Sequence, residues 1–205
     1  MTTQRLLVLT LALAASPVAV AGQGVEIIPF AGRQFGGEID IRDGLLNIPA
    51  AWNYGLVIDI PTGAGTKLEV LYARQQTSLE EEELATGTVT TLFPLTVQYV
   101  HVGVLYEPTD VTATRPFGGL TGGITNFDSR EPDREGVLKF SGGFVGGVKR
   151  ALAPHVGVRL DGRILFTFLS STDEIFCAPP NECLTGVEGA IVAQALLTAG
   201  LMLSF

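Results

Sequence analysis

The sequence predicts an all-β protein, an eight-stranded antiparallel up-and-down transmembrane β-barrel. The clearest sign is the C-terminal stretch Ala190 to Phe205, where every second residue is apolar and the residues between them are mixed and partly polar. A strand in a soluble domain typically has about 5–6 residues. A tilted strand that crosses a membrane needs about 9–11 residues. The C-terminal stretch has the length and the two different faces of a membrane strand.

The composition supports the same fold class. Mean hydropathy is high at +0.36, and charged residues make up 17% of the chain, against about 25% in an ordinary globular domain. Apart from the N-terminal segment, the sequence holds no apolar run long enough to span a membrane as a helix. Only every second residue of a barrel strand faces lipid, so a barrel explains this combination. The net charge of −8 argues against a nucleic-acid partner, which needs a basic surface.

The first 21 residues are predicted to be a cleavable secretory signal peptide. Arg5 provides the positive charge, Leu6 to Ala15 the apolar segment, and Ala19 to Ala21 the small residues of a cleavage site. An uncleaved membrane helix is the alternative, but the apolar segment is shorter than the roughly 20 residues that a helix needs. The predicted domains are therefore a signal peptide at 1–21 and one barrel domain at 22–205.

Seven further segments alternate in the same way and bring the predicted number of strands to eight, the smallest even number for a transmembrane barrel. They are Gly24–Phe35, Asn53–Ile60, Thr66–Gln75, Leu92–Tyr106, Phe117–Phe127, Val137–Val148 and Val156–Phe168. The first has an unclear phase, and a bulge near Pro29 or Gly32 would reconcile its two apolar sets. Leu92–Tyr106 changes phase near its middle, and the sequence alone does not explain why.

The connections alternate in length. The first, third, fifth and seventh are long and polar, and the second, fourth and sixth are shorter, which predicts short periplasmic turns and long outer loops. The third contains the acidic run Glu80 to Glu83. We interpret this run as a solvated, mobile loop, because four adjacent carboxylates lack a fixed geometry for Ca²⁺. Binding of divalent cations is the alternative.

The last loop carries both cysteines, Cys177 and Cys183. An exported chain enters an oxidising compartment, and we expect the two thiols to form a disulfide there. The alternative is two free thiols. With no histidine nearby, two cysteines do not make a metal site.

Alternation alone does not say which face meets lipid, because a soluble lipocalin-like barrel also has one apolar face. The strands contain few charges, and these are of mixed sign, so inside a narrow barrel they could pair. The predicted polar network of the lumen is Asp59, Lys67, Glu69, Gln98, Lys139, Arg159, Asp161 and Arg163. We interpret it as a structural core, because the interior of an eight-stranded barrel is just wide enough to be filled by its own side chains. A narrow path for ions or solutes is the alternative.

Aromatic residues concentrate at the ends of the strands, as expected for girdles at two membrane interfaces. The predicted outer girdle is Trp52, Tyr54, Tyr72, Phe93, Phe127, Phe140 and Phe168, and the predicted inner girdle is Tyr106, Phe117 and Phe205.

Several motifs carry a family resemblance. They are Q-Y-V-H-V-G at Gln98–Gly103, R-P-F-G-G-L-T-G-G at Arg115–Gly123, K-F-S-G-G-F-V-G-G-V-K at Lys139–Lys149 and V-R-L-D-G-R at Val158–Arg163, together with the paired cysteines of the final loop. The chain resembles the small OmpA-like outer-membrane β-barrel superfamily and, within it, a group of eight-stranded proteobacterial barrels. The resemblance implies a monomer in the bacterial cell outer membrane, surrounded by its lipid and lipopolysaccharide. It also implies handling by periplasmic chaperones and the barrel-assembly machinery, with Phe205 as the C-terminal insertion signal.

The sequence offers little for catalysis. Barrel enzymes of the outer membrane are similar to one another in using His with Ser or Asp at the lipid-facing or outer rim. Here His101 lies within a strand and His155 in a predicted periplasmic turn, and neither forms a recognisable couple of base and nucleophile. We therefore predict no cofactor, no metal and a non-catalytic protein, with a structural role or with exposed loops that serve adhesion or envelope integrity. The alternatives are a narrow channel and, less favoured, a lipid-modifying enzyme.

Overall fold

The computed structural model describes residues 24–41, 44–83, 87–108, 114–129, 136–169, 175–178, 182–184 and 191–205. The expected signal peptide at 1–21 lies outside these ranges. Among the described residues, no helix is long and apolar enough to cross a membrane.

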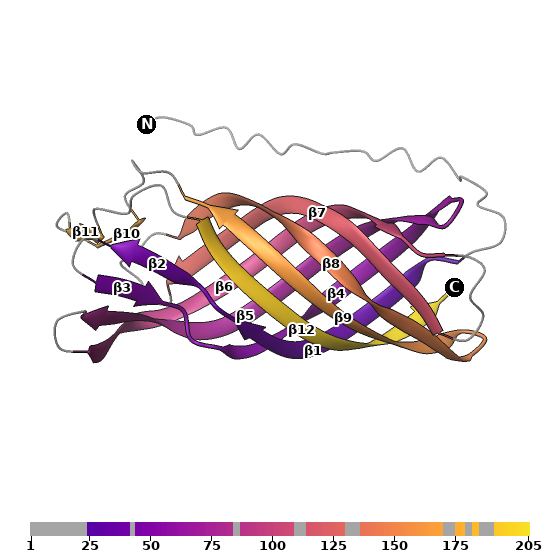
Figure 1. Cartoon of the computed structure of the whole chain (residues 1–205), viewed down its shortest axis with the longest axis horizontal. Coiled ribbons are helices and arrows are strands. Elements are labelled where there is room, and N and C mark those ends of the chain that lie inside the picture. Colours follow the sequence, from indigo (N-terminus) through magenta and orange to yellow (C-terminus); the bar gives the residue numbers. More distant parts are fainter. Residues whose placement is uncertain are drawn as a thin grey trace, which may run out of the picture.

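Eight long antiparallel strands form a closed ring (Figure 1). They are β1 (Glu26–Phe35), β4 (Ala51–Gly63), β5 (Thr66–Glu83), β6 (Thr88–Tyr106), β7 (Thr114–Ser129), β8 (Val137–Ala153), β9 (Val156–Phe168) and β12 (Ile191–Ser204). Each pairs with the next ring strand along the chain, and β12 returns to pair with β1, which closes the barrel. The predicted eight-stranded up-and-down barrel is confirmed.

Three tight or short connections lie at one end of the barrel, together with the start of β1 and the C-terminus (Figure 1). The β4–β5 and β8–β9 turns have two residues each, and in the first of them Ala64 and Gly65 adopt the left-handed conformation, with φ of 51° and 78°. Four short strands lie at the opposite end. They are β2 (Glu38–Ile41) with β3 (Gly44–Asn47), and β10 (Ile175–Ala178) with β11 (Glu182–Leu184).

The acidic run was predicted to be a mobile loop, and this prediction is wrong. Glu80 to Glu83 forms the last part of β5, paired on one side with β3 and on the other with β6. The third connection is short because β5 and β6 continue for 18 and 19 residues. The sequence did not indicate this part of the strand because its residues are polar at consecutive positions, which leaves no alternation to detect.

The bulge predicted in the first strand is also absent. β1 keeps one register from Glu26, which pairs with Ser204, to Phe35, which pairs with Ala195. Ile28 and Phe30 point into the barrel, whereas Pro29 is exposed on the outside. Both faces of β1 are apolar because the interior is itself partly apolar, and this produced the mixed pattern.

The phase change in β6 has the same explanation. Its pairing with β7 runs from Leu95 to Tyr106 without a shift. Leu95 and Tyr99 are fully buried inside, whereas Val102 and Val104 are exposed on the outer wall. From Leu95 to Tyr106 the strand is regular, and its apolar residues move from the inward face to the outward face along it.

The outer wall is rich in large exposed apolar side chains, as a lipid-facing surface requires. The girdle residues that point outward are Trp52, Tyr54, Tyr72, Phe140 and Phe168, with Tyr106 and Phe205 near the other end. Three girdle assignments are wrong, because Phe93, Phe117 and Phe127 are only 2%, 6% and 3% exposed and point inward. Each shares the inward row of its strand with residues such as Leu95 or Thr125.

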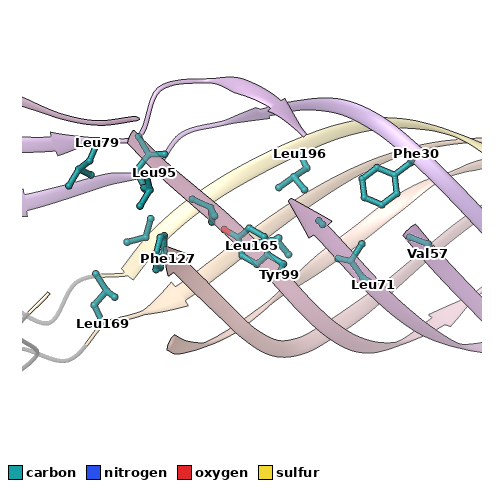
Figure 2. Close-up of a cluster of buried hydrophobic side chains, with 14 of the residues drawn as sticks. Phe30, Val57, Leu71, Leu79, Leu95, Tyr99, Phe127, Leu165, Leu169 and Leu196 are labelled. Carbon is teal, nitrogen blue, oxygen red and sulfur yellow. The ribbon is translucent and has the colours of Figure 1, made fainter. Parts of the chain in front are cut away.

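The interior contains a continuous apolar cluster over much of its length. Figure 2 shows Leu79, Leu95 and Leu169 toward the end with the short extra strands, and Val57 and Leu71 deeper in the barrel. Tyr99 and Leu165 lie between these groups (Figure 2). The half of the lumen near the tight turns is different, because its inward rows carry charge.

Candidate functional site

Ten charged side chains from the described part of the chain meet inside the barrel, near the tight turns. Five are carboxylates and five are cations, so the cluster has no net charge: Glu26, Asp59, Glu69, Glu107 and Asp161 with Lys67, Arg115, Lys149, Arg159 and Arg163. Arg115 has a side chain that is 29% exposed, and the others are almost completely buried. We call this set the charged plug.

The first tier of the charged plug is built on β9. Arg159, Asp161 and Arg163 alternate along this strand, so all three point inward. Arg163 binds both carboxylate oxygens of Glu69, at 2.7 and 3.0 Å, in a bidentate pair. Arg159 donates to Glu69 at 2.7 Å, to Asp161 at 2.8 Å and to Asp59 at 3.0 Å. Each guanidinium therefore links carboxylates from more than one strand.

The second tier lies closer to the turns and is built on two lysines. Lys67 Nζ lies 2.7 Å from Glu26 and 3.1 Å from Glu107. Lys149 Nζ contacts Asp59 at 2.6 Å and Glu107 at 3.3 Å, so it joins the two tiers. Buried charges are tolerated only when they are paired and hydrogen-bonded, and every member of the plug has a partner of opposite charge.

Six of the eight residues predicted for the lumen network lie together in the plug: Asp59, Lys67, Glu69, Arg159, Asp161 and Arg163. Gln98 does not belong there. It shares the outward row of β6 with Val100, and its side chain accepts a hydrogen bond from Tyr72 Oη at 3.3 Å. Lys139 lies on an inward row, but at the opposite end of β8 from Lys149.

Sequence reasoning missed four members of the plug: Glu26, Glu107, Arg115 and Lys149. Lys149 was assigned to a turn, although it continues the inward row of β8 that contains Ser141 and Val145. Glu107 continues the inward row of β6 in the same way, one residue past the end of the strand. Extending each row by two residues would have found both.

A neutral polar layer separates the charged plug from the apolar part of the lumen. His101 Nε2 lies 2.7 Å from Ser141 Oγ, and its Nδ1 lies 3.1 Å from Thr121 Oγ1. Thr125 continues the chain of hydroxyl groups to Ser141 and to Thr167. A buried hydrogen bond also joins Tyr99 Oη to Gln194.

The pair of His101 and Ser141 has the distance of a base and a nucleophile, but not the surroundings. Both side chains are completely buried, and the second ring nitrogen meets a threonine hydroxyl rather than a carboxylate. An acyl-transfer triad needs an orienting acid and an accessible nucleophile. This arrangement can hold neighbouring strands together, but the pair offers no position for a substrate.

Two further predicted features concern the ends of the chain. The side chains of Cys177 and Cys183 lie outside what the structure describes, so the disulfide stays a prediction. Phe205 is exposed beside the start of β1, where its N–H donates to the carbonyl of Val25 at 3.1 Å. Its role as an insertion signal also stays a prediction.

No protein-family model matches the sequence, and no curated protein matches it either. Solved structures do match. Neisserial surface protein A (NspA) superposes with a TM-score of 0.59 at 14% identity, over 89% of this chain and 97% of NspA. The outer membrane protein OprG from Pseudomonas aeruginosa gives 0.59 at 13% identity, over 89% and 98%. The outer membrane protein AlkL, studied in lipid bilayers, gives 0.55 at 13% identity, over 93% and 96%.

This chain has the fold of the small outer-membrane β-barrels. The exposed apolar wall is what that fold presents to hydrocarbon, so the barrel lies in a bacterial outer membrane. Short turns of such barrels face the periplasm and long connections face outward. The charged plug therefore occupies the periplasmic half of the lumen, and the short extra strands stand at the outer end.

Proposed function

We propose that this small outer-membrane barrel neither conducts nor catalyses, and that it anchors a surface sheet used in adhesion or envelope integrity. The observation that carries the proposal is that the lumen is filled along its length. Paired charges fill the periplasmic half together with a small apolar cluster of Leu105, Phe117 and Val145, and side chains such as Leu95, Tyr99 and Leu165, with no exposed surface, fill the rest. A water-filled path of useful width would leave some of these groups exposed.

The outer end of the barrel supports a role at the cell surface. A tilted membrane strand needs about 9–11 residues, whereas β5 and β6 have 18 and 19. The excess continues outward as a paired hairpin, and β3 and β2 extend its sheet. Leu46, Ile48 and Leu79 are buried and belong to the same apolar cluster as the interior of the barrel, so the extension shares its core with the barrel. The result is a platform of paired strands rather than a set of independent loops.

One edge of the platform is suited to contact with another chain. Within the described residues, β6 pairs with β7 only from Leu95 onward, so Val89, Thr90 and Thr91 pair with β5 alone. Thr88, Val89, Thr90 and Thr91 are exposed and uncharged. An exposed edge without charge is where an added strand pairs most readily. Strand addition at this edge would give the adhesive interaction a physical basis.

Planar-bilayer recording of the purified barrel tests the non-conducting part of the proposal. We expect no discrete conductance steps, with a known porin in the same bilayer as the positive control. Steps that vanish in Arg159→Ala or Arg163→Ala would establish the narrow channel instead, because conduction would then depend on the plug. A deletion strain with altered lipid A would favour the enzyme.

The surface role is tested by shortening the hairpin without touching the barrel. Removing residues 80–83 together with 88–91 deletes paired positions from both strands and keeps the connecting residues. We expect this variant to lose cell attachment, or resistance to detergents, as completely as the deletion strain does. An intact phenotype in the shortened variant, with normal amounts of folded barrel, would exclude the platform as the functional part.

A further inference from the structure

A groove with a volume of about 610 Å³ crosses the lipid-facing wall of the barrel. It runs over β4, β1, β12, β9 and β8, and small residues leave room for it: Ala31, Ala199, Gly162 and Gly146. Arg33 and Trp52 line the same groove. A groove in a wall that faces hydrocarbon must be filled, because the side chains that line an empty groove would lose van der Waals contacts.

The register of the strands gives the direction of the groove. The residues that stand opposite one another on consecutive strands around the ring are Arg33, Leu197, Gly162, Gly146, Gly118, Tyr106, Thr66 and Gly63. This path begins near the outer end of β1 and arrives at a periplasmic turn. The strands are therefore staggered, as barrel closure requires, and the groove descends from Arg33 toward Gly146, deeper in the bilayer.

The upper end of the groove carries positive charge. The Arg33 guanidinium lies 5.7 Å from the centre of the Trp52 ring and donates to the carbonyl of Ala50 at 3.4 Å. A second arginine, Arg74, lies on the outward row of β5, and its Nε has no hydrogen-bond partner in the described part of the chain. Two cations thus flank β4 on the outer half of the wall.

The two arginines lie at nearly the same depth. Trp52 pairs with Arg33 on one side and, by the continuous β4–β5 register, stands opposite Gln76 on the other. Arg74 is two residues closer to the periplasm than Gln76. Strands lie about 4.8 Å apart, rise about 3.3 Å per residue and tilt by about 40°. Crossing two strands from Arg33 to Gln76 therefore moves outward, and stepping back from Gln76 to Arg74 moves toward the periplasm by nearly the same height. The depths of the two arginines differ by less than about 2 Å. Both guanidiniums therefore lie at the same level of the outer membrane–water interface.

We propose that this groove binds one lipid A moiety of lipopolysaccharide, with its phosphates on Arg33 and Arg74 and one acyl chain descending to Gly146. Lipid A combines two phosphates with several acyl chains, and it fills the outer leaflet where this end of the groove opens. Arginine binds phosphate by charge-assisted, bidentate hydrogen bonds. Trp52 and Tyr54 stand between the arginines on the outward row of β4, at the level where aromatic rings meet head groups.

A second copy of the chain fits this surface less well. A symmetric dimer would place the same patch against itself. The outward rows of β4, β1, β12 and β9 contain no carboxylate, and that of β5 contains Glu80 and Glu82 only at its outer end, beyond the level of Arg74. The guanidiniums of one copy would therefore face those of the other without a counter-charge at the same depth. A doubly phosphorylated lipid supplies that counter-charge.

Native mass spectrometry of the full barrel tests the proposal, with bisphosphorylated lipid A, dephosphorylated lipid A and phosphatidylethanolamine added separately. We expect one retained bisphosphorylated lipid A per barrel, and binding at least tenfold weaker for the other two lipids. The double variant Arg33→Gln/Arg74→Gln should bind bisphosphorylated lipid A more weakly by a similar factor. Arg150→Gln is the matched control, because Arg150 is also exposed on the outer wall but lies at the periplasmic end of β8.

The acyl chain is tested separately by filling the groove. A Cβ added at Gly146 would come no closer than 3.8 Å to its neighbours, so Gly146→Leu fills the groove without disturbing the strand. Gly122→Leu is the matched control, with a closest approach of 4.0 Å on β7, outside the groove. We expect only Gly146→Leu to weaken lipid A binding. Equal retention of the phosphorylated and dephosphorylated lipids, equal losses in the control variants, or a lipid-free dimer would overturn the proposal. A gel shift on heating verifies that each variant is folded.

Discussion

The two halves of the lumen are built from the same strands and filled by different chemistry. In the periplasmic half, the inward row of β9 carries Arg159, Asp161 and Arg163, and these side chains are held by ion pairs from other strands. In the outer half, the same row continues with Leu165 and Leu169, which pack in the apolar cluster. One strand therefore passes from a charged interior to an apolar one within a few residues.

The difference shows what each kind of filling demands. Apolar packing is non-directional, so the outer half requires only that side chains of suitable volume fill the space. The charged plug requires a fixed partner for every member, because a buried charge without one is costly. We expect the periplasmic half to be specified residue by residue, and the outer half to tolerate substitutions of similar volume.

The largest effect is expected for Arg159→Ala. The substitution leaves Asp59 and Asp161 short of a cation in a buried site, which typically costs about 3–5 kcal/mol. Urea unfolding in lipid vesicles measures it, followed by the fluorescence of Trp52, the only tryptophan. Arg150→Ala is the control and should change the free energy of unfolding by less than about 0.5 kcal/mol. Equal small losses in both variants would mean that the plug contributes no specific pairing.

Leu165→Ala should destabilise the outer half by about 2–5 kcal/mol, because Leu165 is fully buried and the change leaves a cavity. Conservative variants of the two residues compare the two kinds of packing directly. Leu165→Met keeps the volume and should cost less than about 1.5 kcal/mol, whereas Arg159→Lys loses the fork that joins three carboxylates and should cost more. The same urea titration measures all of these variants. If Leu165→Met is the more damaging of the two conservative changes, the proposed contrast between the halves is wrong.

Tyr99→Phe probes the boundary between the halves and should have a smaller effect, about 1–3 kcal/mol. It keeps the ring but removes the hydroxyl that donates to Gln194 Oε1, so this buried oxygen loses its donor. Tyr106→Phe is the control, since Tyr106 is exposed at the periplasmic end of the outer wall. Urea unfolding distinguishes the two variants, and a Tyr99→Phe barrel as stable as the control would show that the buried bond contributes nothing.

The sequence predicted the barrel where one face of a strand is uniform. β9 and β12 were clear because their outward rows are apolar throughout and their inward rows contain polar groups. β1 and β6 were ambiguous because Ile28 and Leu95 bring apolar residues to the inward face. The plug was only partly predictable, since pairing between distant strands decides which charges meet. Alternation placed Lys149 on the inward row only if the predicted strand was extended past Val148, and it could not show which carboxylates Lys149 would meet.

Gln98 was assigned to the lumen because it alternates with apolar Val97 and Tyr99, and Gln98→Leu tests the outward position that the structure gives it. The change removes a hydrogen bond from Tyr72 but adds apolar surface toward lipid, so we expect a net change within about 1 kcal/mol. Gln75→Leu is the matched variant inside the barrel, where the amide donates to the carbonyl of Pro49 at 3.3 Å and is fully buried. It should cost about 1–3 kcal/mol, because the carbonyl of Pro49 loses one of its two donors and the buried Gln194 amide loses an acceptor. The difference between these two glutamines in one urea titration measures which side of the wall each occupies. Equal losses of unfolding free energy in the two variants would indicate that Gln98 faces the lumen.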